Sequence, residues 1–219
     1  AQRLALMLQN QTEEEFADSR FQVLSELTRL RQLCCDPALV YENYEGGSAK
    51  LDLCIELIQS AVESGHKILL FSQFTSMIEI LTARLQEESI SCFVLQGSTK
   101  KEQRAQMVEQ FNRDDTSVFC ISLKAGGTGL NLTGADIVIH YDPWWNVAVE
   151  NQATDRAHRI GQKNVVTVYK LIAKGTIEEK IIKLQQMKKE LAEEILSGDE
   201  IKTASFQREE LLELLEERF

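Results

Sequence analysis

Short apolar runs alternate with amphipathic helical stretches through the middle of this 219-residue chain, and no other feature constrains its fold as strongly. Five runs rich in β-branched and aromatic residues predict strands, at 67–73, 91–96, 117–123, 136–142 and 165–172. Between and after these runs, the spacing of apolar residues predicts helices, at 49–64, 75–88, 100–113, 146–159 and 176–197. This order favours parallel strand pairing, because a helix returns the chain to the same end of the sheet. We therefore expect an α/β fold with a parallel sheet and helices on both faces.

Both ends of the chain carry helical patterns without strands. One or two helices are expected over 4–33, and a short amphipathic helix over 209–218. A linker-like stretch, YENYEGGS, ends at Ser48, which can cap the helix that follows it. We therefore expect an α/β domain with a helical extension on each side, in three segments that span 1–47, 48–175 and 176–219.

The charge of the chain is distributed unevenly. In total, 34 acidic and 24 basic side chains give a formal charge of −10, which taken alone argues against a polyanion as partner. Much of the excess lies at the ends, since 1–47 carries 8 acidic and 4 basic side chains and 176–219 carries 12 and 7. Residues 97–175, by contrast, carry 8 acidic and 10 basic side chains. The net charge therefore does not exclude a nucleic-acid partner for the middle of the chain.

Membrane and metal-binding functions receive no support from the sequence. No apolar run approaches the roughly 20 residues that span a bilayer, and the first residues turn polar and acidic too early for a secretory signal. The five cysteines show no CxxC spacing, and His66 and His140 have no matching partners, so we expect no metal site. Reduced cytosolic thiols are the default expectation.

Two loops after expected strands carry residues suited to a phosphate, because ligands of open parallel sheets bind at the carboxyl ends of strands. GSTKKEQR (97–104) is either an ordinary helix start with solvated lysines or a phosphate-binding helix N-terminus. LKAGGTGLNL (123–132) is either a tight structural turn or a loop that lets a phosphate approach the backbone. It is not a nucleotide-binding P-loop, since the chain contains no G-x-x-x-x-G-K-[ST] motif.

The expected helix over 146–159 carries two arginines at a suggestive spacing. Gln152, Arg156 and Arg159 follow an i, i+4, i+7 pattern, which places all three on one helical face. The two guanidiniums can clamp an anion through their forked donors, or they can form surface ion pairs with Asp155 or Glu150.

Both tryptophans of the chain, Trp144 and Trp145, lie in the loop before this helix. Paired large aromatics on a loop are costly without a partner. We therefore expect one of them in the core and the other at a contact surface.

Taken in order, four segments closely resemble motifs IV, IVa, V, Va and VI of the Swi/Snf-type ATPases of helicase superfamily two. These segments are FSQFTSMIEIL, QGSTKKEQRAQMVEQF, SLKAGGTGLNLTGADIVIHYDPWWN and QATDRAHRIGQ. The resemblance extends from about 20 to 197, and DRAHRIGQ after DPWWN is specific to this family. It implies a C-terminal RecA-like lobe of a motor that hydrolyses ATP while it tracks double-stranded DNA. The phosphate loop and the Mg²⁺-binding acidic box of the family's first lobe are absent here, so the resemblance implies ATP and Mg²⁺ held mainly by that other lobe.

The resemblance also assigns roles to individual residues. The family's arginine fingers map onto Arg156 and Arg159, with Gln152 beside them as a third catalytic candidate. Nucleotide contacts map onto Gly127, Gly129, Asn131 and Asp155. DNA contacts map onto Ser72, Gln73, Gly97, Ser98, Thr99, Lys100, Lys124, Gly126 and Trp145.

We therefore expect the second motor lobe of a double-stranded DNA translocase that remodels protein–DNA complexes, with no ATPase activity of its own. Its expected partners are double-stranded DNA, the N-terminal RecA-like lobe of the same parent chain and a DNA-bound protein, and no membrane. The helical ends correspond to a protrusion and a brace in the family. The expected location is the cytoplasm or nucleoid in a bacterium and the nucleus in a eukaryote. Two alternatives remain open: a strand-separating helicase lobe of the same superfamily, and a non-catalytic module that binds nucleic acid or protein.

Overall fold

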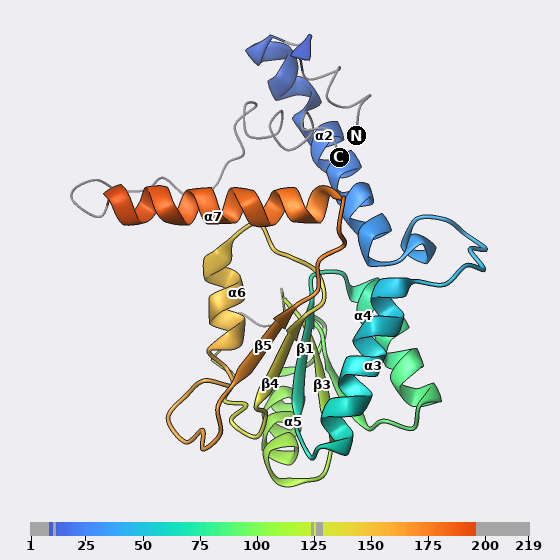
Figure 1. Cartoon of the computed structure of the whole chain (residues 1–219), viewed down its shortest axis with the longest axis vertical. Coiled ribbons are helices and arrows are strands. Elements are labelled where there is room, and N and C mark those ends of the chain that lie inside the picture. The colour runs from blue at the N-terminus through green and yellow to red at the C-terminus, as the bar shows by residue number, and fades with distance from the viewer. Residues whose placement is uncertain (1–8, 11, 124, 126–128, 196–219) are drawn as a thin grey trace. The chain divides into compact units, whose positions relative to one another are not determined.

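The computed structural model describes residues 9–10, 12–123, 125 and 129–195 (Figure 1). The chain forms two compact units. One unit spans Asn43–Ile172, and the other contains the described residues on either side of it. The division of the chain into three segments at 47 and 175 stays a prediction from the sequence. The helix expected over 209–218 lies outside the described residues.

A five-stranded parallel sheet forms the centre of the Asn43–Ile172 unit (Figure 1). Its strands in chain order are β1 (Ile68–Ser72), β2 (Cys92–Leu95), β3 (Val118–Ser122), β4 (Ile137–His140) and β5 (Thr167–Lys170). They are arranged in the order β2-β3-β1-β4-β5, and all four pairings are parallel. The carboxyl ends of the strands therefore share one edge, where Phe71 pairs with Ile121 of β3 and with His140 of β4. The expected parallel α/β fold is confirmed.

Helices cover both faces of this sheet (Figure 1). On one face lie α3 (Ala49–Glu63) and α4 (Thr75–Glu87), and on the other lie α5 (Lys101–Arg113) and α6 (Val147–Thr154). The core on the α5–α6 side contains Phe71 and Phe119 of the sheet, Phe111 of α5 and Ala153 of α6. The rings of Phe111 and Phe119 stack with their centroids 5.2 Å apart. Alternating residues of each buried strand thus serve two separate cores, which explains the near-continuous apolar runs.

Helix α6 is shorter than the sequence pattern predicts. It ends at Thr154 instead of continuing to 159, and the following residues form a series of tight turns. The amide of Gln162 draws this segment toward neighbouring loops, because its Nε2 donates to the carbonyls of Ala135 (2.7 Å), Ala157 (3.2 Å) and Thr133 (3.3 Å). Gly161 adopts a φ of 107°, which is not helical, within these turns. The expectation of a helix over 146–159 is therefore wrong beyond Thr154.

The second unit contains two helices that contact each other, α2 (Glu13–Cys35) and α7 (Ile177–Ile195). A capping box starts α2, in which the Thr12 N–H donates to Oε2 of Glu15 and the Glu15 N–H donates to Oγ1 of Thr12. A single 3₁₀ turn, η1 (Pro37–Leu39), follows it. Among the described residues, no helix combines the length and the apolar character that crossing a bilayer requires.

Candidate functional site

At the carboxyl end of β1, a buried hydrogen-bond network joins two loops. Ser72 is fully buried, and its hydroxyl donates to Oδ1 of Asp142 at 2.5 Å. The same hydroxyl oxygen accepts from the N–H of Phe74 at 3.2 Å, and the Gln73 N–H donates to the Asp142 carboxylate at 3.3 Å. The side chain of Ser72 therefore supports the start of α4 from inside the fold. Of the two expected DNA-contacting residues here, only Gln73 is partly exposed.

The turn before α5 carries four of the expected DNA-contacting residues. Gly97, Ser98 and Lys100 are exposed, and Thr99 is half-buried. Thr99 closes the turn from both sides, because its N–H donates to the carbonyl of Gln96 and its hydroxyl oxygen accepts from the Gln96 N–H, both at 3.1 Å. A Cβ added to Gly97 would meet no atom within 4 Å, so the backbone is open to a ligand at this point.

Helices α4 and α5 both begin at this edge without a side-chain cap. Other helices of the unit are capped, α3 by Ser48 and α6 by Asn146. The first N–H groups of an α-helix have no intrahelical acceptor, and together with the helix dipole they attract anions. Two helix N-termini suited to phosphate therefore begin at this edge, after β1 and after β2, the two strands that flank β3 in the sheet.

Arg104 lies in the first turns of α5 and connects this turn to the loop after β3. Its Nε donates to the carbonyl of Thr99 at 2.8 Å, and its Nη2 donates to those of Gly97 at 3.0 Å and Gln96 at 3.3 Å. Its Nη1 donates to the carbonyl of Ala125 at 3.3 Å. Arg104 is absent from the expected site residues. The available signal is a basic residue near a helix N-terminus, where the helix dipole disfavours positive charge.

The glycine-rich loop is described only in part. Lys124, Gly126 and Gly127, three of the expected ligand-binding residues, lie outside the described residues. Gly129 and Asn131 are described and exposed. The side chain of Asn112 on α5 holds the end of this loop, since its Nδ2 donates to the carbonyl of Asn131 at 2.8 Å.

The arginine segment differs from the arrangement that helical spacing predicts. Because α6 ends at Thr154, Arg156 and Arg159 lie in the turns after the helix and do not share a helical face with Gln152. Gln152 and Arg159 are exposed, whereas Arg156 is only 4% exposed. Arg159 is held by carbonyl oxygens, with 3.0 Å from Nε to Asp155 and 3.3 Å from Nη1 to Gly129.

The buried guanidinium of Arg156 has donors without acceptors. Within the described part of the chain, its Nε and Nη1 have no hydrogen-bond partner. Burial and, to a lesser extent, the charge of Arg159 lower the pKa of Arg156 to about 10, so the side chain is still charged at neutral pH. A buried charge without a partner is unfavourable, and an anion that reaches it from outside gains a strong, charge-assisted contact.

The alternative of ion pairing is not observed among the described residues. No described carboxylate lies within 4.0 Å of the guanidinium of Arg156 or Arg159. Glu150 instead binds Lys170, with 2.5 Å between Oε2 and Nζ, and accepts from the Trp144 N–H at 2.6 Å. The Glu150 carboxylate thus fixes the start of α6 to the edge strand β5.

The loop that contains both tryptophans is anchored to the fold by Trp144. Its side chain packs against the core on the α5–α6 side. Trp144 and Trp145 are both half-buried, and the contact surface expected at one of them stays a prediction.

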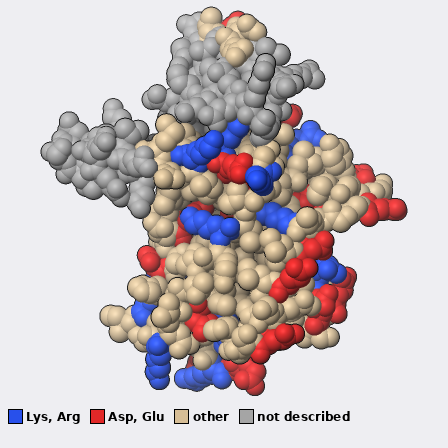
Figure 2. Space-filling model, viewed as in Figure 1, with Lys and Arg blue, Asp and Glu red and all other residues tan. Residues whose placement is uncertain are grey.

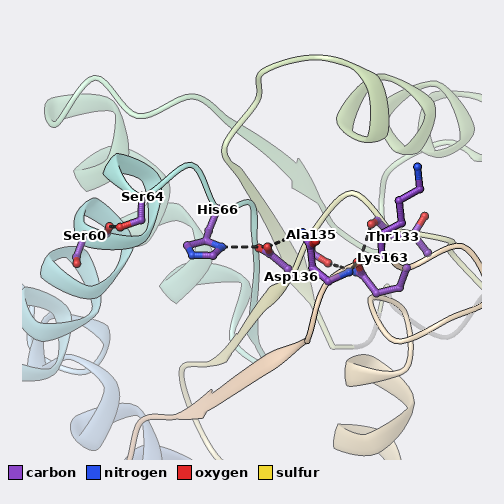
Figure 3. Close-up of polar contacts among 9 residues, drawn as sticks. Ser60, Ser64, His66, Thr133, Ala135, Asp136 and Lys163 are labelled. Atoms are coloured by element: carbon purple, nitrogen blue, oxygen red, sulfur yellow. Dashed lines mark hydrogen bonds and ion pairs between the residues drawn. The ribbon is translucent and has the colours of Figure 1, made fainter.

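A second polar cluster lies at the opposite, amino-terminal edge of the sheet (Figure 3). His66 points toward Asp136, with 3.0 Å between Nδ1 and Oδ2, and Asn164 donates to the same carboxylate oxygen at 3.0 Å. These residues precede β1, β4 and β5 and tie three connections together. The cluster is therefore separate from the candidate site at the carboxyl ends of the strands.

Acidic side chains also gather away from the candidate site. Figure 2 shows them on the side of the molecule where α3 and α4 lie. The exposed acidic residues of these two helices and the residue after α4 are Asp52, Glu56, Glu63, Glu79, Glu87 and Glu88. The acidic α3–α4 side thus contrasts with residues 97–175, which carry 8 acidic and 10 basic side chains.

Comparison with known proteins identifies the family. Residues 49–161 match the model of the helicase conserved C-terminal domain, which is half of the chain. The C-terminal domain of the Sulfolobus solfataricus SWI2/SNF2 ATPase has 30% sequence identity and a TM-score of 0.72, over 98% of this chain and 90% of that one. This chain belongs to the helicase C-terminal domain family, as a lobe of the SWI2/SNF2 type.

Two further relatives extend this comparison. The Sulfolobus solfataricus SWI2/SNF2 ATPase core in complex with double-stranded DNA has 33% identity and a TM-score of 0.75, over 98% of this chain and 45% of that one. An uncharacterized ATP-dependent helicase of Mycoplasma pneumoniae is 45% identical over 202 residues, which cover 90% of this chain. The chain spans only 19% of the length of that relative.

Proposed function

We propose that this chain is the second motor lobe of an ATP-dependent translocase that moves along double-stranded DNA and remodels protein–DNA complexes. The observation that carries the proposal is the buried, charged guanidinium of Arg156, whose Nε and Nη1 have no acceptor among the described residues. It suits the terminal phosphate of a nucleotide presented by another lobe. The names of the relatives, an ATP-dependent helicase and an ATPase core in complex with double-stranded DNA, support the choice of ATP and DNA.

The residues present fit the nucleotide that this proposal requires. Arg156 and Arg159 provide two positive charges on consecutive turns, and carbonyl oxygens of Asp155 and Gly129 hold the second arginine. Bound ATP with Mg²⁺ supplies the phosphoanhydride bond whose hydrolysis drives the motor. Arg156 and Arg159 stabilise the negative charge that develops during phosphoryl transfer, an effect commonly worth about 10³–10⁵ in rate. Gln152, Gly127, Asn131 and Asp155 complete the proposed nucleotide contacts on this lobe.

The DNA contacts of the proposed motor lie at the uncapped starts of α4 and α5. Gln73 precedes α4, and the exposed residues Gly97, Ser98 and Lys100 precede α5. Backbone N–H groups, hydroxyls and a lysine bind phosphate oxygens and do not distinguish bases, which allows movement along any sequence. The family resemblance adds Thr99, Lys124, Gly126 and Trp145 to this surface, whereas the side chain of Ser72 is buried beneath it.

Two hydrogen bonds, one between backbone groups and one from a side chain, couple the arginines to the glycine-rich loop. The Leu132 N–H donates to the carbonyl of Arg156 at 3.0 Å, and Arg159 donates to Gly129. Closing of the two lobes on a nucleotide moves the arginines, and these bonds carry the movement into the loop that follows β3. Alternating affinity of such loops for phosphates then converts hydrolysis into steps along the duplex. The helical segments 1–47 and 176–219 serve as protrusion and brace.

The proposal is tested with the parent protein that contains both lobes. We expect ATP hydrolysis that double-stranded DNA stimulates, displacement of a third strand from a triplex, and no separation of the strands of a forked duplex. Strand separation would favour the helicase alternative, and the absence of ATP hydrolysis both with and without DNA would favour the non-catalytic alternative. This chain alone should hydrolyse no ATP. The nucleus in a eukaryote, or the cytoplasm or nucleoid in a bacterium, is the matching location.

A further inference from the structure

Arg104 makes an unusual set of contacts for a surface arginine. Its guanidinium donates to four backbone carbonyls, three in the turn at Gln96, Gly97 and Thr99 and one across the edge at Ala125. No described carboxylate lies within ion-pair distance of it. The hydrogen-bond donors of Arg104 therefore hold two loops in place. Its positive charge is not neutralised by a described carboxylate and lies beside the start of α5.

The position of Arg104 in the helix strengthens this point. A cation in the first turns of a helix is disfavoured by the dipole, and here it lies near Lys100 and Lys101 as well. The hydrogen bonds of the planar guanidinium offset this unfavourable position, because its N–H groups point in fixed directions toward several acceptors at once. Lysine offers the same charge without this fork.

We propose that Arg104 is a positioning residue that clamps the turn at 96–99 to the loop after β3, so that both loops contact neighbouring DNA phosphates together. The inference rests on the proposed function, since both loops carry expected DNA contacts. It assigns Arg104 no contact with the nucleotide or with the reacting atoms. Loss of the clamp lets the two loops move independently, which weakens the apparent affinity for DNA and leaves the hydrolysis step intact.

The test uses three variants of the parent protein and measures ATP hydrolysis as a function of DNA concentration. Arg104→Ala should raise the DNA concentration for half-maximal stimulation about tenfold, with kcat at saturating DNA changed by less than about twofold. Arg104→Lys is a second probe that keeps the positive charge but lacks the fork of donors. It should show most of the same increase in the half-maximal DNA concentration. Arg113→Ala is the matched control, because Arg113 lies at the other end of α5 and forms only a surface pair with Glu109.

Two outcomes of the ATP-hydrolysis measurement would contradict the proposal that Arg104 clamps the two loops. One is an unchanged half-maximal DNA concentration in Arg104→Ala, and the other is full rescue by Arg104→Lys, which would show that charge alone matters.

Amide hydrogen exchange tests the role of Arg104 independently of the proposed function, because the exchange measurement needs no DNA. In Arg104→Ala, the amides at 96–99 and the amides around Ala125 should both exchange faster, and Arg113→Ala should change neither. Faster exchange at only one of the two loops would refute the clamp. A wild-type protein without DNA-stimulated hydrolysis would refute the proposed function, whereas the exchange result would still decide whether Arg104 joins the loops.

Discussion

The side chain of Arg159 donates a hydrogen bond to the backbone carbonyl of Gly129, with 3.3 Å between Nη1 and the oxygen. A Cβ added to Gly129 would lie 3.7 Å from the same Nη1, so the loop passes close to the guanidinium. The glycine-rich loop and the arginine segment, 30 residues apart in the chain, are therefore direct neighbours at the carboxyl edge of the sheet. In the proposed motor, this contact lets one lobe sense a nucleotide and change its hold on DNA.

Gly97→Ala should weaken DNA binding without affecting the fold. The free protein has room for the added methyl group, since no atom lies within 4 Å of the Cβ position. A phosphate that approaches the backbone at this point would meet the methyl group, so we expect the Kd for double-stranded DNA to rise about tenfold. The free energy of unfolding should change by less than about 0.5 kcal/mol.

Gly65→Ala is the matched control for this prediction. Gly65 follows α3 near the opposite edge of the sheet and has a φ of 80°, which alanine adopts only with strain. This variant should lose about 1 kcal/mol of stability and bind DNA as the wild type does. DNA titration and chemical denaturation of both variants measure the two effects. Equal DNA affinity in Gly97→Ala and wild type would remove Gly97 from the DNA surface.

Asp142→Ala should destabilise the fold. The carboxylate is 1% exposed and accepts from the Ser72 hydroxyl at 2.5 Å and from the Gln73 N–H. Its removal leaves these buried donors without this acceptor, and we expect a loss of about 2–4 kcal/mol in the free energy of unfolding. Asp142→Asn, which keeps one acceptor oxygen, should lose less. Asp115→Ala, at an exposed carboxylate, is the control, and an equal effect in the two alanine variants would contradict the role given to Asp142.

His140 should make the stability of the protein depend on pH. Burial lowers the pKa of His140 to about 4 from an ordinary value of 6.5, while Glu150 raises it and Lys170 lowers it further. The unfolded chain therefore binds a proton between these two values that the folded chain does not bind. The stabilisation is fully present above pH 6.5 and decreases as the pH falls, by about 3 kcal/mol near pH 4.

Denaturation of His140→Gln and wild type across this range measures that effect. The variant should show a shallower dependence between pH 6.5 and pH 4, and the two proteins should run in parallel above pH 7.5, where His140 is neutral in both states. The side chain contacts Thr154 at the end of α6, with 3.1 Å from Nε2 to Oγ1. Parallel curves over the whole range would show that His140 does not titrate as described.

The central strands β1, β3 and β4 can be predicted from the sequence because they are buried on both faces, and such strands read as continuous apolar runs. The run ILLFS of β1 is buried at every position, and no other common element combines such a run with this length. The order of the motifs was equally informative about the family. Periodicity failed at Arg156, since helix α6 ends early through contacts of Gln162 with loops that lie about 30 residues earlier in the chain. Local spacing carries no information about such contacts.

The support beneath the candidate site could not be derived from the sequence for the same reason. The bond between Ser72 and Asp142 joins residues 70 positions apart, and it buries a serine that was expected at the DNA surface. The four carbonyl contacts of Arg104 depend on where two loops meet at the edge of the sheet. Motif spacing predicts which loops carry the candidate site, whereas the side chains that hold those loops can be recognised only in the three-dimensional structure.

The central claim, that Arg156 acts on the nucleotide, is tested most directly by Arg156→Ala in the parent protein with both lobes. We measure DNA-stimulated ATP turnover together with the Kd for double-stranded DNA, with Arg113→Ala as the control for loss of an exposed arginine. The account predicts a fall in turnover of at least about 10³-fold, with DNA affinity within about twofold of the wild type. Turnover within a few-fold of the wild type would contradict it.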